Sequence, residues 1–449
     1  MKIAPNWLCY GYCALFTVLP WSIEFDLGSY NLNLPSEPLI GALGLGLIWL
    51  FFQYTKVFLR VLLSNILLQT SLLYLGWMAV SACYSTLPMV SWKYWLVEVG
   101  QWWVFAVGIS VCSNIWRRAL PWFVYSVGGV AVYTLVHHGF YHFRADQALL
   151  APMPFFPDHT MWSAVLAMVL FLGGRALCSS ENALSATLST KIKGVNALFP
   201  EGLKAIPPSM ARATCLLLLV ALIASTCRAA WASVLLAGAV LGFLYLERKG
   251  RLLLLVILLF AGFYVAGKMP DSIGQDVSAM ERLNRWHCAL RMAYDRPILG
   301  FGPGTYQYKY LDYQKEQEMT RISLRIAAGD RGPDTYGRGG GAHSEYLRAL
   351  AETGWPGLVF WLGMLGVALV AGFVSVTLDA GAPPLALKIL QNADLHLKLP
   401  ALLALITFLS HGLVNDFMHD GRIAALVWGC LALIFATKKE DSASLGFSG

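Results

Sequence analysis

The chain has 449 residues, of which 57% are hydrophobic and 13% are charged, and its formal net charge is +7. A water-soluble protein carries about 25% charged residues, so this composition excludes a soluble globule. The basic residues are spread over many short segments, which argues against a nucleic-acid-binding surface. The sixteen Trp, nineteen Tyr and twenty-three Phe residues suit two membrane–water interfaces, where amphipathic rings settle.

Apolar runs long enough to cross a bilayer recur along the chain. A helix crosses the hydrocarbon core in about 20 residues, and these runs predict an all-α polytopic membrane protein with about twelve transmembrane helices. The first run lacks an A-x-A cleavage site, so we expect it to be retained as a helix. The spans are expected near residues 6–22, 38–54, 61–83, 93–113, 119–138, 160–178, 211–226, 229–246, 251–267, 355–378, 399–416 and 422–437.

The basic residues predict the orientation. With the N-terminus inside, seventeen Lys and Arg residues fall in the short inner loops and tails, and four fall in the short outer loops. This is a strong positive-inside bias, from which the long segment 268–354 is exempt. We therefore expect spans one to nine in residues 1–267, a large helical periplasmic loop domain in 268–354, spans ten to twelve in 355–437, and a cytoplasmic tail in 438–449. Both termini are then cytoplasmic.

Two connecting regions differ in character. The inner loop 179–210 is rich in Ser, Ala and Lys, and we expect a flexible connector there. The outer segment 268–354 is too long for a simple connection, so we expect it to fold. Within it, Glu281–Tyr294 predicts an amphipathic helix, residues 300–304 a glycine-rich turn, and residues 314–341 a mobile polar stretch.

A second helix of the outer segment is predicted from about Ala342 to a stop at Gly354. This places His343 at the start of a helix, just above the membrane. An imidazole titrates near neutral pH and can take a proton from a hydroxyl nucleophile, but His343 can equally be a capping or surface residue. Glu345 and Glu352 are positioned to orient or neutralise a neighbour.

Three arginines are candidates for binding an anion. Arg228 separates two apolar spans, where a guanidinium is costly unless it reaches water or a charged partner. It can snorkel to the interface, pair with an outer carboxylate, or grip phosphate with its planar fork of donors. Arg282 and Arg285 lie three residues apart on the predicted helix and project on roughly the same side, beside Trp286. They are either a solvated face or a second phosphate-gripping element.

Further polar residues mark the outer ends of the spans. Asp158 and His159 open span six, where Asp158 is suited to cap the helix N-terminus. A polar group between spans eleven and twelve either lines a cavity or is interfacial. Cys and His residues nowhere cluster at zinc-ligand spacing, so neither a metal site nor a cofactor is expected. The group between spans eleven and twelve comprises His411, Asn415, Asp416, His419 and Asp420.

Three motifs resemble those of the O-antigen ligase and O-antigen polymerase superfamily of membrane glycosyltransferases, most of all O-antigen ligase. Residues 225–230 (STCRAA) are similar to an S-R-x-x element, with Cys227 in place of the usual Ser. Residues 282–304 resemble an R-x-x-x-W … P-x-x-G-x-G stretch. Residues 343–357 resemble H-N-x-x-L … E-x-G-x-x-G, with Ser344 where Asn is commoner.

The resemblance implies transfer of a glycan from undecaprenyl diphosphate to a hydroxyl acceptor at the periplasmic face of the bacterial inner membrane. The acceptor would be lipid A–core, another lipid-linked glycan or a protein. His343 would be the base, with Arg228 and Arg282 holding the diphosphate and Arg285 as a rival for the second clamp. The remaining expected substrate contacts are Glu345, Tyr346, Glu352, Asp158, His159 and Tyr306, although Tyr306 is equally suited to packing.

A transporter or flippase of lipid-linked glycans is a competing interpretation. Transporters place charged residues at mid-membrane in broken helices and are often built from repeated halves. This chain shows no sustained internal repeat, and its outstanding charges lie at the predicted outer face. These observations favour an enzyme, in which arginines rather than a metal would stabilise the leaving group.

Overall fold

The protein is described here from a computed structural model. Helices dominate the described residues, which are 5–26, 31–112, 114–188, 208–247, 249–259, 276–320, 323, 340–378 and 395–435. The long helices are α1 (Asn6–Val18), α2 (Ser36–Gln53), α3 (Thr55–Ser64), α4 (Ile66–Cys83), α5 (Pro88–Gln101), α7 (Asn114–Phe140), α8 (His159–Leu188), α9 (Pro208–Ala224), α10 (Arg228–Tyr245), α12 (Val277–Asp295), α15 (Glu345–Leu378), α17 (Leu395–His411) and α18 (Gly421–Phe435), with one more over residues 249–259.

Short elements complete the described fold. A π-helix, η2 (Trp102–Gly108), and α6 (Ile109–Val111) continue α5, and α13 (Tyr306–Lys309) belongs to the outer segment. The 3-10 helices are η1 (Leu19–Trp21), η3 (Tyr310–Tyr313) and η4 (Glu316–Glu318). Strands β1 (Ile23–Asp26) and β2 (Asn31–Leu34) pair antiparallel, with Ile23 opposite Leu34.

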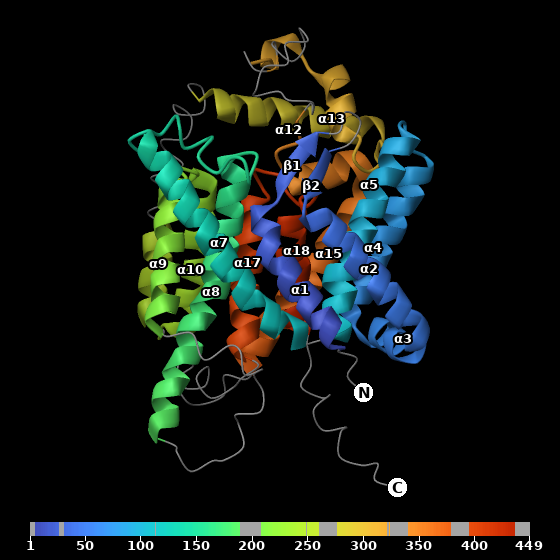
Figure 1. The fold of residues 1–449 in the computed structure, drawn as a ribbon. Coiled ribbons are helices and arrows are strands. Elements are labelled where there is room, and N and C mark those ends of the chain that lie inside the picture. Colours follow the sequence, from blue (N-terminus) through green and yellow to red (C-terminus); the bar gives the residue numbers. More distant parts are fainter. Residues whose placement is uncertain are drawn as a thin grey trace.

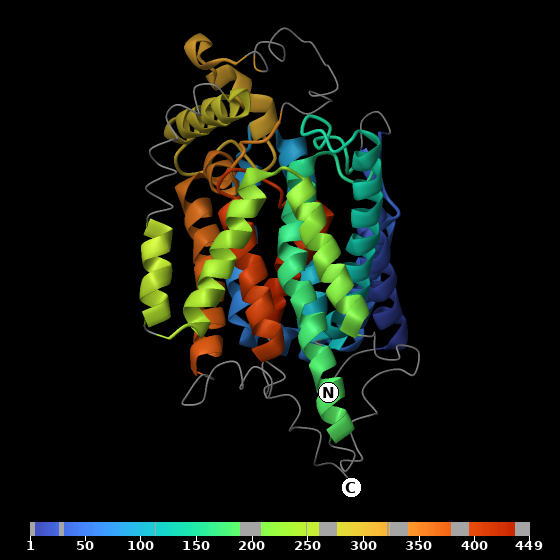
Figure 2. The same cartoon turned by 90° about the vertical axis from the view of Figure 1, so that its left-hand side faces the viewer.

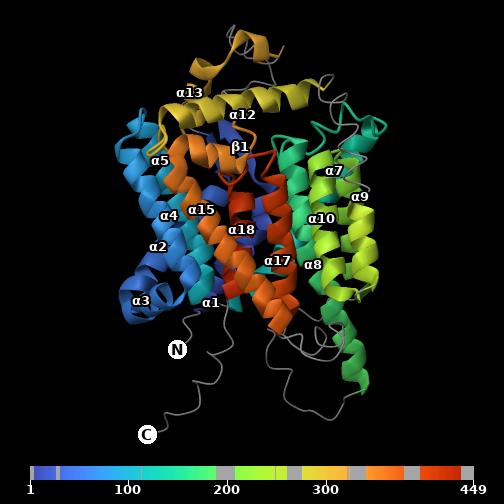
Figure 3. The same ribbon diagram turned by 180° about the vertical axis from the view of Figure 1, so that it is seen from behind.

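The helices form a bundle that is covered at one end. α12 and α13 lie across this end, and the β1–β2 hairpin reaches the same end (Figure 1). Viewed from the side, α12 sits above the ends of the bundle helices, and the helix over residues 249–259 stands at the periphery (Figure 2). From behind, α15 runs the length of the bundle beside α17 (Figure 3). α17 packs on α8 and α10, and α4 packs on α15.

α18 is the central helix of the bundle. Every residue from Arg422 to Ile434 is buried, as expected for a helix that is apolar on all sides. By contrast, α2 leaves Leu45, Trp49 and Phe52 at 69%, 53% and 75% exposure. Such an apolar outer face suits lipid rather than water, so the structure supports a membrane protein.

Each of the twelve predicted spans overlaps a helix of the described chain, although residues 260–267 of the ninth and 436–437 of the twelfth lie outside the described residues. Within the described residues, four helices are long and apolar enough to cross a membrane, and five more are apolar but shorter. The all-α membrane fold is therefore confirmed, whereas the number of twelve crossings stays a prediction. The four long ones are Ser36–Gln53, Ile66–Cys83, Arg118–Phe140 and Glu345–Val376.

The predicted connectors are tested only in part. α8 continues to Leu188, so the connector expected from residue 179 begins later than the sequence suggested. Neither glycine nor proline interrupts residues 179–188, and Ala is the best helix former. Residues 189–207, and residues 324–339 of the stretch expected to be mobile, lie outside the described residues.

The outer segment folds around its own small core. Its first helix, predicted over Glu281–Tyr294, is α12, which Asp276 caps by accepting the backbone N–H groups of Ser278 and Ala279. Tyr306 and Tyr310 stack with ring centroids 5.5 Å apart. This core joins α12 to the start of α15, and it consists of Cys288, Ala289, Met292, Phe301, Tyr306, Tyr310, Ala342 and Ala351.

The glycines of the outer motifs allow two backbone segments to touch. Gly354 has a φ of 71° and breaks α15 into two helical parts, as the sequence predicted. A Cβ atom on Gly354 would lie 2.1 Å from the carbonyl oxygen of Ile298, and one on Gly300 would lie 2.3 Å from the Glu352 carbonyl. The Gly302 N–H donates to that same carbonyl at 2.8 Å. These glycines therefore hold the turn after α12 against α15.

Candidate active site

Arg228 is the first residue of α10, directly after a sharp turn from α9. Thr226 in this turn has a φ of 54°, and Cys227 occupies the N-cap position of α10. The Arg228 side chain is 75% exposed and pairs through Nη2 with Oδ2 of Asp276. Of the alternatives that the sequence left open, pairing with an outer carboxylate is the one observed.

Asp276 joins α10 to α12. One of its oxygens caps α12, and the other binds Arg228. Partial burial raises the pKa of Asp276, but the hydrogen bond from Arg228 and those from the α12 backbone bring it below the ordinary value. Asp276 is therefore a carboxylate at neutral pH. It was not among the residues singled out from the sequence, because its partner is 48 positions away.

Arg282 lies on α12 near Arg228, but it has no ion-pair partner among the described residues. Its Nε atom is buried and has no hydrogen-bond partner among the described residues. Burial lowers the pKa of Arg282, and the charge of Arg228 lowers it further, whereas Cys227 and Asp276 raise it. A cation held close to a second cation without a carboxylate of its own is suited to bind an anion.

Arg285 has a different environment from Arg282. It is only 4% exposed, and its Nε atom donates to Oε1 of Glu281 at 2.9 Å. Its Nη1 atom donates to the carbonyl oxygen of Gly341 at 3.0 Å, and its guanidinium lies 5.0 Å from the ring centroid of Tyr310. Arg285 is thus engaged inside the outer segment, so of the two rival arginines it is Arg282 that remains available to a ligand.

His343 precedes α15 in a left-handed conformation with a φ of 50°. Its backbone N–H donates to Oδ1 of Asp416 at 3.1 Å, and its carbonyl accepts the indole N–H of Trp286 at 3.0 Å. The neighbouring Ala342 N–H donates to Oδ2 of Asp416 at 3.1 Å. α12 on one side and the α17–α18 loop on the other therefore fix the position of His343.

The charge state of His343 follows from its surroundings. Enclosure by the protein lowers its pKa well below the ordinary value, the charges of Arg285 and Arg282 lower it further, and the side chain of Asn415 raises it. The imidazole is therefore neutral at pH 7 and can accept a proton. Arg282 interacts electrostatically with both Arg228 and His343. The three expected catalytic residues therefore lie in one region at the covered end of the bundle.

Glu345 and Tyr346 contact the α17–α18 region rather than a free surface. Glu345 is 3% exposed, and its Oε1 atom accepts the N–H of Met418 at 2.6 Å while its Oε2 atom pairs with Arg348 at 2.6 Å. The Tyr346 hydroxyl donates to the carbonyl oxygen of Leu409 at 2.8 Å. Both residues were expected to bind substrate, but their polar groups already have partners within the protein.

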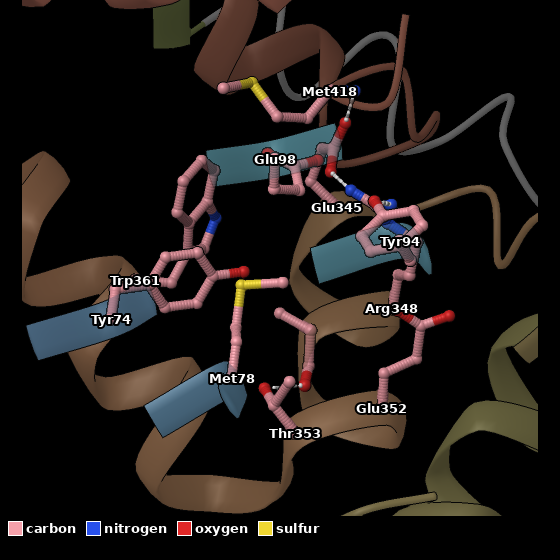
Figure 4. Close-up of a pocket in the computed structure, with 11 residues that line it drawn as sticks. Tyr74, Met78, Tyr94, Glu98, Glu345, Arg348, Glu352, Thr353, Trp361 and Met418 are labelled. Atoms are coloured by element: carbon pink, nitrogen blue, oxygen red, sulfur yellow. Dashed lines mark hydrogen bonds and ion pairs between the residues drawn. The ribbon is translucent and has the colours of Figure 1, made fainter. Parts of the chain in front are cut away.

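Glu352 and Tyr306 also have hydrogen-bond partners within the protein. Glu352 is buried, and its Oε1 atom accepts the backbone N–H of Tyr306 at 3.0 Å. The Tyr306 hydroxyl donates to the carbonyl oxygen of Arg285 at 2.7 Å. Packing is therefore the role observed for Tyr306. Glu345 and Glu352 line a small pocket between α4, α5 and α15, in which Arg348 lies close to Tyr94 and Glu98 (Figure 4).

Asp158 and His159 start α8. Asp158 Oδ1 accepts the backbone N–H groups of Thr160 at 2.7 Å and Met161 at 2.8 Å, so it is the helix cap that the sequence allowed. His159 instead lies within the electrostatic range of Arg282. Its Nδ1 atom is buried without a hydrogen-bond partner in the described part of the chain.

His411 and Asn415 complete the surroundings of Arg282. His411 ends α17, is 1% exposed, and lies within the electrostatic range of Arg282 and His159. Its Nε2 atom is 3.9 Å from the Cys227 sulfur. The sequence placed both residues in a polar group between two spans but gave no reason to prefer them over His419 or Asp420. The side chain of Asp420 accepts the N–H of Arg422 at 2.8 Å.

Comparison with known families agrees with these motifs. Residues 213–362 match the family model described as O-antigen ligase. This part of the chain is therefore similar to the O-antigen ligase domain. The resemblance to the O-antigen ligase superfamily is thereby confirmed, and its members are membrane glycosyltransferase-like ligases and polymerases. A comparison with curated proteins gave no significant match.

The matched region contains Arg228, Arg282 and His343, but it does not contain all the residues near Arg282. His159 belongs to α8, and His411 belongs to α17, both outside residues 213–362. Packing of α17 against α8 and α10 brings these histidines to Arg282. The surrounding helices of the bundle therefore contribute side chains to the region that the domain defines.

Proposed function

We propose that the protein transfers a glycan from undecaprenyl diphosphate to a hydroxyl acceptor at the periplasmic face of the bacterial inner membrane. Ligation of O-antigen to lipid A–core is the reaction we favour among those of the superfamily. Polymerisation of repeat units and transfer to protein share the donor chemistry and differ in the acceptor. The observation that carries the proposal is the buried Nε atom of Arg282, which has no hydrogen-bond partner among the described residues, while its guanidinium interacts electrostatically with both Arg228 and the neutral imidazole of His343.

The proposed reaction is a single displacement at the anomeric carbon. His343 accepts the proton of the acceptor hydroxyl as its oxygen forms a bond to the anomeric carbon. The bond from that carbon to the diphosphate oxygen breaks, and undecaprenyl diphosphate leaves with the electron pair. Attack from the side opposite the leaving group inverts the anomeric configuration.

Arg228 and Arg282 stabilise the charge that develops on the leaving group in this proposal. Removing one preorganised donor of this kind typically lowers kcat by 10²- to 10³-fold, on the order of the loss we expect for each arginine. Arg228 is exposed and reaches the donor from the outside, whereas Arg282 binds it from within. Because two guanidiniums supply the positive charge, the reaction is proposed to need no metal ion.

The test is transfer in vitro by the purified protein. A defined undecaprenyl diphosphate-linked glycan is offered with lipid A–core, a second lipid-linked glycan or a protein acceptor, each with and without a chelator. We expect transfer to lipid A–core that persists in chelator. Loss of transfer in chelator would overturn the metal-independent mechanism. Preference for a second lipid-linked glycan or for a protein would show that the reaction is polymerisation or protein glycosylation instead of ligation to lipid A–core.

A variant separates an enzyme from a transporter. His343→Ala removes the proposed base and is expected to abolish glycan transfer while donor binding persists. His287→Ala is the matched control, since His287 is an exposed histidine of α12 whose partner is Glu318 at 3.2 Å. Undiminished transfer by His343→Ala would contradict the assignment of the base.

A further inference from the structure

Four buried polar atoms around Arg282 lack a hydrogen-bond partner in the described part of the chain. They are Nε of Arg282, Nδ1 of His159, Nδ1 of His411 and Nδ2 of Asn415. In native proteins roughly 90% or more of buried polar groups are hydrogen-bonded. Each unsatisfied group destabilises the folded protein, so four of them in one region indicate that a ligand with matching groups binds there.

These atoms come from separate elements, but they share one location. The positive charge of Arg282 disfavours protonation of both His159 and His411, and a charge on His159 disfavours protonation of His411. Asn415 contacts the side chain of His343, on which Arg282 also acts. Packing of α17 against α8 and the 3.9 Å approach of His411 to Cys227, which precedes Arg228, agree with this common location. The groups come from α8, α12, α17 and the α17–α18 loop.

The chemistry of these groups selects an anion. Arg282 and the Asn415 amide nitrogen are donors only, and each imidazole can present one N–H. Arg228 adds a second positive charge nearby. A metal cation would be repelled by the two guanidiniums, whereas a phosphate offers several acceptor oxygens that match several converging donors.

His411 is arranged to present its Nδ1–H to such a ligand. The Cys227 sulfur lies 3.9 Å from the opposite ring nitrogen, Nε2. A thiol that donates to Nε2 leaves the ring proton on Nδ1, which is the buried atom without a partner. The ring is further held by an edge-on contact with Phe417, with centroids 5.2 Å apart.

We propose that Arg282, His159, His411 and Asn415 form a buried phosphate site that binds one phosphate of the leaving undecaprenyl diphosphate. Arg228 then contacts the donor from the exposed side. This inference rests on the proposed function and deepens it, because it assigns two histidines and an asparagine to the leaving group. If this site exists, removing the Nδ1–H of His411 must weaken the binding of undecaprenyl diphosphate without changing the fold.

The decisive variant replaces His411 with a ring that has no donor. His411→Phe keeps an aromatic ring against Phe417 but removes both ring nitrogens, of which Nδ1 is buried without a partner in the described part of the chain. A buried polar group without a partner destabilises the folded state by its desolvation penalty, and an apolar ring of similar shape avoids that penalty. We therefore expect the unliganded protein to keep or raise its melting temperature, while its affinity for undecaprenyl diphosphate falls about tenfold. A histidine with a purely structural role would not give these opposite effects.

The binding experiment uses purified protein in lipid nanodiscs with three probes. Undecaprenyl diphosphate is compared with undecaprenol, which lacks phosphate, and with phosphatidylglycerol, an ordinary anionic lipid. We expect the wild type to bind the diphosphate far more tightly than either. His411→Gln retains an N–H donor and is expected to keep most of the affinity, and His287→Ala serves as the control.

The outcomes separate this inference from the proposed function. Unchanged diphosphate affinity in His411→Phe, with transfer intact, overturns the phosphate site alone. Equal binding of the diphosphate and undecaprenol by the wild type overturns the proposed donor as well. Effective competition by phosphatidylglycerol would show a general lipid-headgroup site and would also overturn the assignment to the leaving group.

Discussion

Asp416 accepts the backbone N–H of His343 with its Oδ1 atom at 3.1 Å. Its other oxygen accepts the N–H of Ala342, so one carboxylate holds two consecutive residues. In return, Glu345 accepts the N–H groups of Phe417 and Met418. The segment before α15 and the α17–α18 loop thus fix each other. Asp416 lies outside the matched ligase domain, yet it determines where the proposed base stands.

Asp416→Asn tests this support of His343. The amide nitrogen cannot accept a hydrogen bond, so either Ala342 or His343 loses its partner, at a cost of about 1–3 kcal/mol. We expect transfer to fall by at least about tenfold while donor binding changes less than about twofold. Steady-state kinetics and donor titration measure the two effects. Asp312→Asn, at an exposed carboxylate of the outer segment, should leave both unchanged. Full activity of Asp416→Asn would show that the two hydrogen bonds are dispensable.

The pH dependence of transfer should reflect Asp416 rather than His343. Burial raises the pKa of Asp416 to about 7, with Arg348 opposing and Glu345 adding to the rise. Above pH 7 the ionised carboxylate accepts both N–H groups, and below it protonation removes one acceptor. The pKa of His343 is lowered, so this imidazole stays neutral through the same range. We expect the rate to fall as pH drops below about 7, and Asp416→Asn to lack this step.

Stability should change with pH in the opposite direction. The pKa of Asp416 is raised in the folded protein, so the folded state binds this proton more tightly than the unfolded state. The resulting stabilisation is present at low pH and is lost as pH rises through about 7. Thermal unfolding in detergent should therefore show a melting temperature that decreases between pH 5 and pH 7.5. A flatter profile is expected for Asp416→Asn, and equal slopes would contradict the assignment.

Arg282 and Arg285 should respond to substitution in opposite ways. Arg282→Ala removes a guanidinium without an ion-pair partner in the described chain, so donor binding should fall at least about tenfold with little loss of stability. Arg285→Ala leaves the buried Glu281 carboxylate unpaired, and breaking a buried ion pair costs about 3–5 kcal/mol. Melting curves and donor titrations distinguish the two variants.

An exposed arginine provides the control for this pair. Arg144 lies on the outer loop before α8, is 68% exposed and pairs with Asp146. Arg144→Ala is therefore expected to change neither stability nor donor binding. If Arg285→Ala instead lost donor binding with normal stability, the roles of Arg282 and Arg285 would have to be exchanged.

Local features of the sequence predicted much of the fold. Apolar runs marked the bundle helices, and the polar periodicity around Arg282 marked α12 to within a few residues at each end. Gly354 marked the end of a helix, because glycine readily adopts the positive φ, here 71°, that interrupts a helix. Asp158 was recognised as a possible helix cap from its position alone. Each of these signals depends only on residues close together in the chain, so it can be recognised in a single sequence without an alignment.

The partners of the site residues could not be predicted in this way. The residues alone did not separate Arg282 from Arg285, and only the family resemblance favoured Arg282, because their different surroundings depend on Gly341 and on the start of α10. Glu345 was expected to bind substrate, but it binds the backbone of the α17–α18 loop, more than 70 residues away. The environment of His411 arises from packing of α17 against α8 and α10. Such contacts are long-range, and no local pattern encodes them.

Asp276 is placed to compete with the donor for Arg228. Its carboxylate pairs with that guanidinium and also caps α12. A diphosphate that binds Arg228 must therefore displace or repel a negative charge. Asp276→Asn removes the charge but keeps a side-chain oxygen, and Asn caps helices as well as Asp.

We expect Asp276→Asn to increase the apparent affinity for undecaprenyl diphosphate several-fold. The surface pair itself contributes only about 0–1 kcal/mol, so the melting temperature should hardly change. Asp276→Ala is the matched comparison, since it removes both charge and cap and should lower stability by about 1 kcal/mol. Donor titration at low and high salt measures the effect, which should shrink as salt screens the charges. Weaker donor binding by Asp276→Asn would mean that the carboxylate orients Arg228 for the ligand instead of competing with it.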